Sequence, residues 1–178
     1  MKIRLSQIAD DPFLWQETLD IPLAELDRSE LASITPVECR GKAARLESGF
    51  YLHADLAYTQ ILICDRCLGE YEEPVDESLD LLVQTGDDTG DVEEEKELEE
   101  KELGFLQLEG EVLDTEPLVR EQVQLGIPMK PLCREDCKGL CSECGKDLNE
   151  GECECTDDEI DPRWAALAAL KKPEKQGS

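Results

Sequence analysis

Nine cysteines in 178 residues constrain this chain more than any other feature. The first ten residues hold no apolar run of the kind that a secretory signal requires, so the expected location is the cytoplasm, where thiols stay reduced. No apolar stretch approaches the ~18 residues that a membrane span needs, and no membrane association is expected. Clustered cysteines in a reducing compartment are typical of metal sites or redox groups rather than of structural disulfides.

The sharpest metal signal lies in the last third of the chain. Cys141-x2-Cys144 is followed directly by Gly145, where a close approach of the backbone to sulfur is useful. A tight turn of this length can aim both sulfurs at one ion about 2.3 Å from each, and Cys153 and Cys155 can close a four-sulfur site. Zinc is the usual metal of such closed sites. An iron–sulfur cluster uses the same ligands and is the rival interpretation.

A second C-x2-C pair, Cys64 and Cys67, follows a predicted strand. Together with Cys133 and Cys137 it can form a second site that ties the β-rich region to the tail, and the hypothesis is two zinc ions. A redox pair looks identical in sequence, but the residues after Cys67 make a poor helix start, which disfavours a thioredoxin-like site. The other open alternative is a single metal with spare cysteines. Cys39 is left over and is interpreted as a strand thiol.

The charge balance bears on the partner. Asp and Glu number 44 against 18 Lys and Arg, a formal charge of −26. Phosphate recognition depends on Lys and Arg, so direct nucleic-acid binding is not expected. Aromatic residues make up only 4% of the chain, which disfavours base-stacking platforms. The acidity favours a basic protein partner instead.

A single histidine, His53, limits the catalytic possibilities. Ser-His-Asp and Cys-His chemistry both need a histidine beside the nucleophile. His53 lies in an apolar run over 50–56 that is typical of a strand, so we interpret it as an ordinary strand residue. We therefore expect no enzyme.

The pattern of polar and apolar residues predicts an α+β protein, with an antiparallel β-rich domain, a few helices and a C-terminal cysteine-rich zinc ribbon. Three successive strand-like runs favour antiparallel pairing. Helices are expected after Pro22, before the Gly126-Ile127-Pro128 stop, and after Asp161. The predicted strands cover 2–8, 37–46, 50–64, 75–84 and 104–110, and the predicted helices cover 23–31, 111–125 and 161–170.

Composition shifts divide the chain into five parts. Residues 87–103 hold ten acids and two lysines, so they are predicted to be an acidic disordered loop; an electrostatic lure for a cationic partner is the alternative. The other parts are the β-rich region with its C-x2-C knuckle (1–86), a strand and helix that complete the domain (104–132), the metal ribbon (133–156), and the C-terminal helix and tail (157–178).

Several motifs together resemble those of the YceD family, the large ribosomal RNA subunit accumulation proteins. They are Cys64-Asp65-Arg66-Cys67-Leu68, Pro128-Met129-Lys130-Pro131-Leu132-Cys133, Cys137-Lys138-Gly139-Leu140-Cys141 with Leu148-Asn149, and Asp161-Pro162-Arg163-Trp164. The resemblance spans residues 64–170 and implies a protein that supports processing, synthesis or stability of the large-subunit ribosomal RNA precursor, without a known catalytic activity. Some relatives lack the ribbon from Cys141 to Cys155 but keep the first pair, which implies two separable sites.

The sequence thus predicts a non-enzymatic ribosome biogenesis factor that works through a basic ribosomal or ribosome-assembly protein. Two alternatives stay open: a thiol redox or metal-dependent enzyme using Cys64 and Cys67, and a zinc-ribbon RNA-binding module. The predicted metal ligands are Cys64, Cys67, Cys133, Cys137, Cys141, Cys144, Cys153 and Cys155.

Overall fold

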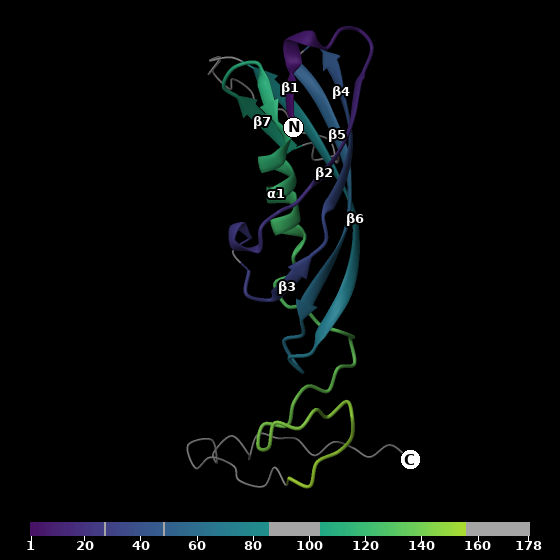
Figure 1. Ribbon diagram of the computed structural model, residues 1–178, viewed down its shortest axis with the longest axis vertical. Coiled ribbons are helices and arrows are strands. Elements are labelled where there is room, and N and C mark those ends of the chain that lie inside the picture. The colour runs from purple at the N-terminus through teal and green to yellow at the C-terminus, as the bar shows by residue number, and fades with distance from the viewer. Residues whose placement is uncertain (27, 48, 86–103, 156–178) are drawn as a thin grey trace, which may run out of the picture. The chain divides into compact units, whose positions relative to one another are not determined.

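The computed structural model describes residues 1–26, 28–47, 49–85 and 104–155. The chain divides into two units, residues 1–137 and 138–178. The elements of the first unit, most of them labelled in Figure 1, are β1 (Lys2–Arg4), η1 (Leu5–Gln7), β2 (Phe13–Leu19), η2 (Leu23–Glu25), β3 (Leu31–Ile34), β4 (Val37–Leu46), β5 (Gly49–Ile63), β6 (Glu70–Thr85), β7 (Gly104–Leu108), β8 (Val112–Asp114) and α1 (Thr115–Gly126).

A six-stranded sheet forms the body of the first unit: five strands follow the order β2-β4-β5-β6-β7, and the sixth, β3, pairs with β5 off this path. The strand β5 has the most extensive pairing in the sheet. Its residues Phe50–Ile63 pair with β6, and its other edge pairs with both β4 and β3. β1 and β8 make a separate two-stranded sheet. The β5–β6 hairpin closes at residues 64–69, and this turn carries the first C-x2-C pair.

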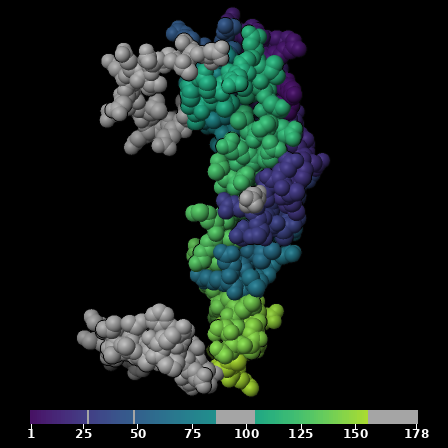
Figure 2. Space-filling view, turned by 90° about the vertical axis from the view of Figure 1, so that its left-hand side faces the viewer, coloured from purple at the N-terminus to yellow at the C-terminus, as the bar shows by residue number. Residues whose placement is uncertain are grey.

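The hydrophobic core lies between one face of the large sheet and α1 (Figure 1). Every second side chain of β5, from Phe50 to Leu62, is buried, as expected for a strand with one face on a core. From the helix, Val119 and Val123 are buried one turn apart. Figure 2 shows the segment that contains η2 beside α1, and Arg120 of the helix forms an ion pair with Glu25 there.

The edge strand β2 contacts the core through two apolar side chains, Trp15 and the partly buried Leu19. Its Trp15 is the buried residue of the strand, and the indole ring lies over Gly41 of β4. A Cβ at Gly41 would come within 1.9 Å of that ring, so only glycine leaves room for it. The sequence pattern does not predict β2, because three consecutive apolar residues over 13–15 are followed by three polar ones, with no alternation.

The predicted strand over 37–46 is confirmed, and β5 begins and ends one residue before the predicted 50–64. The structure is strand-rich, and its described part contains one α-helix. Two of the expected helices are corrected. Residues 112–114 of the predicted helix over 111–125 form β8, because they pair with β1, and the helix begins only after its N-cap Asp114. Of the predicted helix over 23–31 only the short η2 exists, and Leu31 already pairs with β5.

The expected antiparallel pairing is confirmed for β4, β5 and β6, but the sheet as a whole is mixed. β7 runs parallel to β6, from Leu81 opposite Gly104 to Thr85 opposite Leu108. The predicted acidic loop over 87–103 and the predicted helix over 161–170 lie outside the described residues. Across the described ranges, no helix is both long and apolar enough to cross a membrane.

Candidate metal centre

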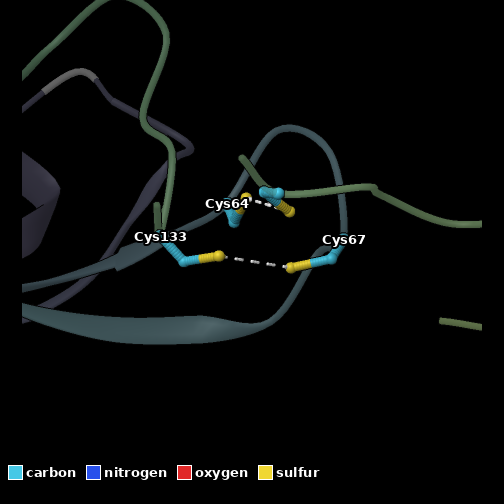
Figure 3. Close-up of side chains that lie close together, drawn as sticks. Cys64, Cys67 and Cys133 are labelled. Carbon is cyan, nitrogen blue, oxygen red and sulfur yellow. Dashed lines mark hydrogen bonds between the residues drawn. The ribbon is translucent and has the colours of Figure 1, made fainter. Parts of the chain in front are cut away.

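The first unit brings together four cysteines that lie far apart in the sequence. Cys64 follows β5, Cys67 lies in the hairpin turn, and Cys133 and Cys137 belong to the segment after α1 (Figure 3). All four sulfur atoms lie within 4.8 Å of one another. The sulfurs of Cys64 and Cys137 are 3.8 Å apart, as are those of Cys67 and Cys133.

These distances fit one four-coordinate ion. Metal–sulfur bonds of about 2.3 Å in a tetrahedron place neighbouring sulfurs roughly 3.8 Å apart. A disulfide would require about 2.05 Å, and all nine cysteines of the chain are free thiols. Four cysteine sulfurs with no open position match the donor set of structural metal sites rather than that of catalytic ones. We call this set group 1.

Backbone contacts hold the two segments of group 1 in register. Within the turn, the N–H of Cys64 donates to the carbonyl of Gly69 (2.9 Å) and the N–H of Leu68 donates to the carbonyl of Cys64 (2.8 Å). Between the segments, the N–H of Asp65 donates to the carbonyl of Pro131 (2.9 Å).

Arg66, between the two cysteines of the turn, adds a side-chain connection. Its Nη1 donates to the carbonyl oxygens of Glu135 (3.2 Å) and Cys137 (2.8 Å). The arginine therefore binds the backbone of the very segment that supplies the other two sulfurs. We did not assign this role from the sequence, because only the tertiary structure brings Arg66 next to residues about seventy positions away.

The electrostatics of group 1 favour a thiolate at its most buried position. Cys64 is fully buried, and burial alone would raise its pKa; backbone N–H groups of Cys133, Cys67 and Arg66 donate to its sulfur and lower the pKa to about 6. Burial raises the pKa of Cys133 to about 12, with further contributions from the neighbouring thiols. One negative charge is thus accommodated by the backbone, and a dication would displace the remaining protons.

The second unit contains the other four cysteines, which we call group 2. The sulfurs of Cys141, Cys144, Cys153 and Cys155 also lie within 4.8 Å of one another. The first two lie on a small hairpin: Leu140 bridges Asp147, the N–H of Cys141 donates to the carbonyl of Lys146 (2.8 Å), and the N–H of Gly145 donates to the carbonyl of Cys141 (2.9 Å).

A thiolate is favoured at Cys141 of group 2 as well. The backbone N–H groups of Cys144 and Glu143, together with the thiol of Cys153, donate to the sulfur of Cys141 and lower its pKa to about 6. The contact with Cys144 and burial raise the pKa of Cys155 to about 12. The electrostatic pattern of group 1 is therefore repeated by a different set of residues.

The eight cysteines thus fall into the two sets that the spacing predicted, and that they hold metal stays a prediction. Cys39 belongs to neither set and is buried in β4, where burial and the Glu17 carboxylate raise its pKa to about 11. His53 lies on β5, with Nδ1 2.9 Å from Asp80 and Nε2 3.4 Å from Asp55.

The comparisons with known proteins decide the family. The family model described as large ribosomal RNA subunit accumulation protein YceD matches residues 52–171, a range that contains all eight grouped cysteines. The chain belongs to the YceD family. No solved structure matches it.

Three relatives illustrate the range of this YceD family. An uncharacterized protein of Mycobacterium tuberculosis is 36% identical over 62% of the chain and 50% of its own length. The uncharacterized protein YlbN of Bacillus subtilis is 26% identical over 97% of the chain and 96% of its own length. The chloroplastic large ribosomal RNA subunit accumulation protein YCED homolog 1 of Arabidopsis thaliana is 28% identical over 80% of the chain and 50% of its own length. The chain spans about half the length of the first of these relatives.

Proposed function

We propose that this YceD-family protein is a non-enzymatic factor that supports the synthesis, processing or stability of large-subunit ribosomal RNA in the cytoplasm, and that it acts through a basic protein. The observation that carries the proposal is the family match over both cysteine groups, together with the name that the family bears. The two groups serve as structural zinc sites. They keep the fold in shape and take no part in bond making or breaking.

The closed donor sets support the structural role of the metal. Each group offers four sulfurs and leaves no ligand position for a water or a substrate, which catalytic zinc needs. Elemental analysis of the purified protein should give close to two zinc ions per chain. Brown colour with visible absorbance would show that the groups hold an iron–sulfur cluster instead of zinc, since the cluster uses the same ligands.

The charge supports a protein partner over naked RNA. The chain carries −26, and its residues 64–77 contain six acids against one arginine. On β6 the side chains of Glu70, Glu72 and Asp76 alternate outward and are exposed. Such a surface repels phosphate and attracts a cationic protein, which it can shield before that protein meets RNA.

The test compares two ligands across a salt series: protein-free large-subunit RNA and the purified proteins of the large subunit. We expect no sub-micromolar RNA binding near physiological salt, and a salt-sensitive complex with at least one basic protein. Tight binding to the free RNA, with an affinity that falls steeply as salt rises, would overturn the proposed partner. In cells, depletion of the protein should lower large-subunit RNA relative to small-subunit RNA.

A second candidate, a thiol redox or metal-dependent enzyme, rests on the lowered pKa of Cys64, since reactive cysteines share that property. Cys64 is however fully buried and enclosed by three further sulfurs. Thiol titration of the zinc-loaded protein separates the two candidates. A redox pair reacts readily with a thiol reagent, whereas ligand sulfurs stay masked until the metal is removed.

A further inference from the structure

The two C-x2-C turns share one backbone design but differ at one residue. In each turn the first cysteine donates its N–H to the carbonyl five residues on and accepts from the N–H four residues on. The residue directly after the second cysteine has a positive φ in both: 58° at Leu68 and 72° at Gly145. Glycine suits this left-handed conformation, and a leucine does not, because its Cβ approaches the following carbonyl oxygen.

Leu68 gains no packing that would explain its presence. Its side chain is 64% exposed, and it is the sole non-glycine residue with a positive φ in the described part of the chain. The unfavourable backbone conformation and the exposed aliphatic side chain thus occur at the same residue. Unfavourable conformations of this kind are concentrated at binding and catalytic sites, where the surrounding structure holds them in place.

The segments around Leu68 are joined by hydrogen bonds and carry more exposed acids than exposed bases. The turn is held by its own hydrogen bonds and by the bond from Asp65 to Pro131, and Met129, two residues before Pro131, is 86% exposed. The exposed acids of the two adjoining segments are Asp65, Glu70, Glu72, Glu135 and Asp136. Three exposed bases lie on the same segments: Arg66 donates to backbone carbonyls, Arg134 pairs with Asp136, and the third is Lys130. We call Leu68, Met129 and these acids the knuckle surface.

We propose that the knuckle surface is the docking site for the basic partner, and that Leu68 is its central apolar contact. The partner segment carries an aliphatic side chain flanked by Lys or Arg, because that chemistry complements an exposed leucine on segments whose exposed carboxylates outnumber their exposed bases. The inference rests on the proposed function, since it places the cationic protein on one named surface. In such a complex the acids accelerate encounter, and burial of Leu68 slows dissociation.

The deciding variant is Leu68→Gly, which removes the side chain and relieves the backbone at once. We expect it to keep two zinc ions and to unfold at the same temperature as the wild-type protein or higher. Binding to the basic large-subunit protein found in the salt series should weaken at least tenfold, mainly through a faster off-rate. The matched control is Leu125→Gln on α1, where a leucine that is 70% exposed changes without effect on binding.

Two results would overturn the inference. A lower unfolding temperature or a lost zinc ion in Leu68→Gly would show that the leucine serves the fold. Unchanged affinity of that variant, with wild-type protein that does bind, would show that the partner docks elsewhere. Failure of the wild-type protein to bind any large-subunit protein would instead defeat the proposed function itself.

The same variant also tests two other occupants of the knuckle surface, RNA and a second copy of the chain. Loss of RNA binding in Leu68→Gly, in a wild-type protein that binds free RNA, would assign the surface to RNA and overturn the proposal. Sedimentation that detects a dimer of the wild-type chain and a monomer of the variant would assign it to a second copy, with the same consequence.

Discussion

The two cysteine groups have similar local chemistry but very different positions in the chain. In group 1 the paired sulfurs come from residues 73 and 66 positions apart, and two of the four cysteines are buried. In group 2 all four cysteines lie within residues 141–155 and are at most half-buried. Group 1 therefore joins distant parts of a domain that already has a core, whereas group 2 closes a short stretch of chain.

The difference predicts what each ion contributes. The first unit has a hydrophobic core that does not include group 2. Of residues 138–155, the described part of the second unit, only Gly139 is buried. A segment with so little buried surface cannot offset the conformational entropy of folding, so we expect a bound ion to supply most of its stability. We therefore expect the first unit to fold around its own core with or without the ion of group 1, and the second unit to depend on the ion of group 2 for its folded structure.

The largest effect is expected from Cys153→Ser. Loss of the group 2 ion removes binding free energy on the order of 10 kcal/mol, and the second unit should lose its folded structure. Hydrogen exchange should show protection lost over 139–155 and kept in the sheet of the first unit. One zinc ion per chain should remain. Retained protection over 139–155 would contradict the view that this segment has no core of its own.

A smaller effect is expected from Cys64→Ser. The zinc count should again fall by one, but the sheet and α1 should stay folded, because the core of Leu52, Leu56, Val119 and Val123 is independent of the ion. The unfolding midpoint should drop as the hairpin end and residues 131–137 lose their connection. Calorimetry measures the drop. A zinc count that stays at its wild-type value would contradict the assignment of Cys64 to a separate site.

Thiol reactivity distinguishes Cys39 from Cys141. After chelation Cys141, whose pKa is lowered to about 6, should react readily with a thiol reagent, whereas the pKa of Cys39, raised to about 11, leaves roughly a hundredfold less thiolate than an ordinary pKa of 9 would at pH 8. Its reaction should therefore be slow at pH 8 and accelerate as the pH rises towards 11. A Cys39→Ala variant, which should lack the slow phase of labelling, identifies the part of the reaction that comes from Cys39. Fast labelling of Cys39 at pH 8 would contradict its burial in β4.

The smallest effect is expected from Gly145→Leu, which places in the group 2 turn the residue that Leu68 places in group 1. No atom lies within 4 Å of a Cβ at Gly145, so the change adds only the left-handed backbone cost, about 1–2 kcal/mol. Zinc titration against a competing chelator should show a weaker group 2 site. An unchanged zinc affinity would mean that this turn tolerates leucine freely, and that Leu68 carries no backbone cost that needs an explanation.

The sequence alone determined what depends on neighbouring residues. The spacing of the cysteines was enough to find the two C-x2-C pairs and to suggest two sets, because a C-x2-C turn aims its sulfurs by local geometry, but it left the partition of the other four open. The alternation of side chains was enough to predict β4 and most of β5, and it also places Cys64 in phase with the buried face that runs from Phe50 to Leu62. Both signals need only a few consecutive residues.

The tertiary structure decided whatever depends on residues that meet only after folding. The same short apolar stretch can be a helix start or a strand, and Val112–Asp114 became a strand because β1 offers it a partner. β7 runs parallel to β6, a direction that no local pattern encodes. The role of Arg66 exists only because residues 135–137 reach the hairpin turn, and the exposure of Leu68 could not be read from its motif. Local propensities are encoded in adjacent residues, whereas pairing partners and exposure are selected by the free energy of the whole packed chain.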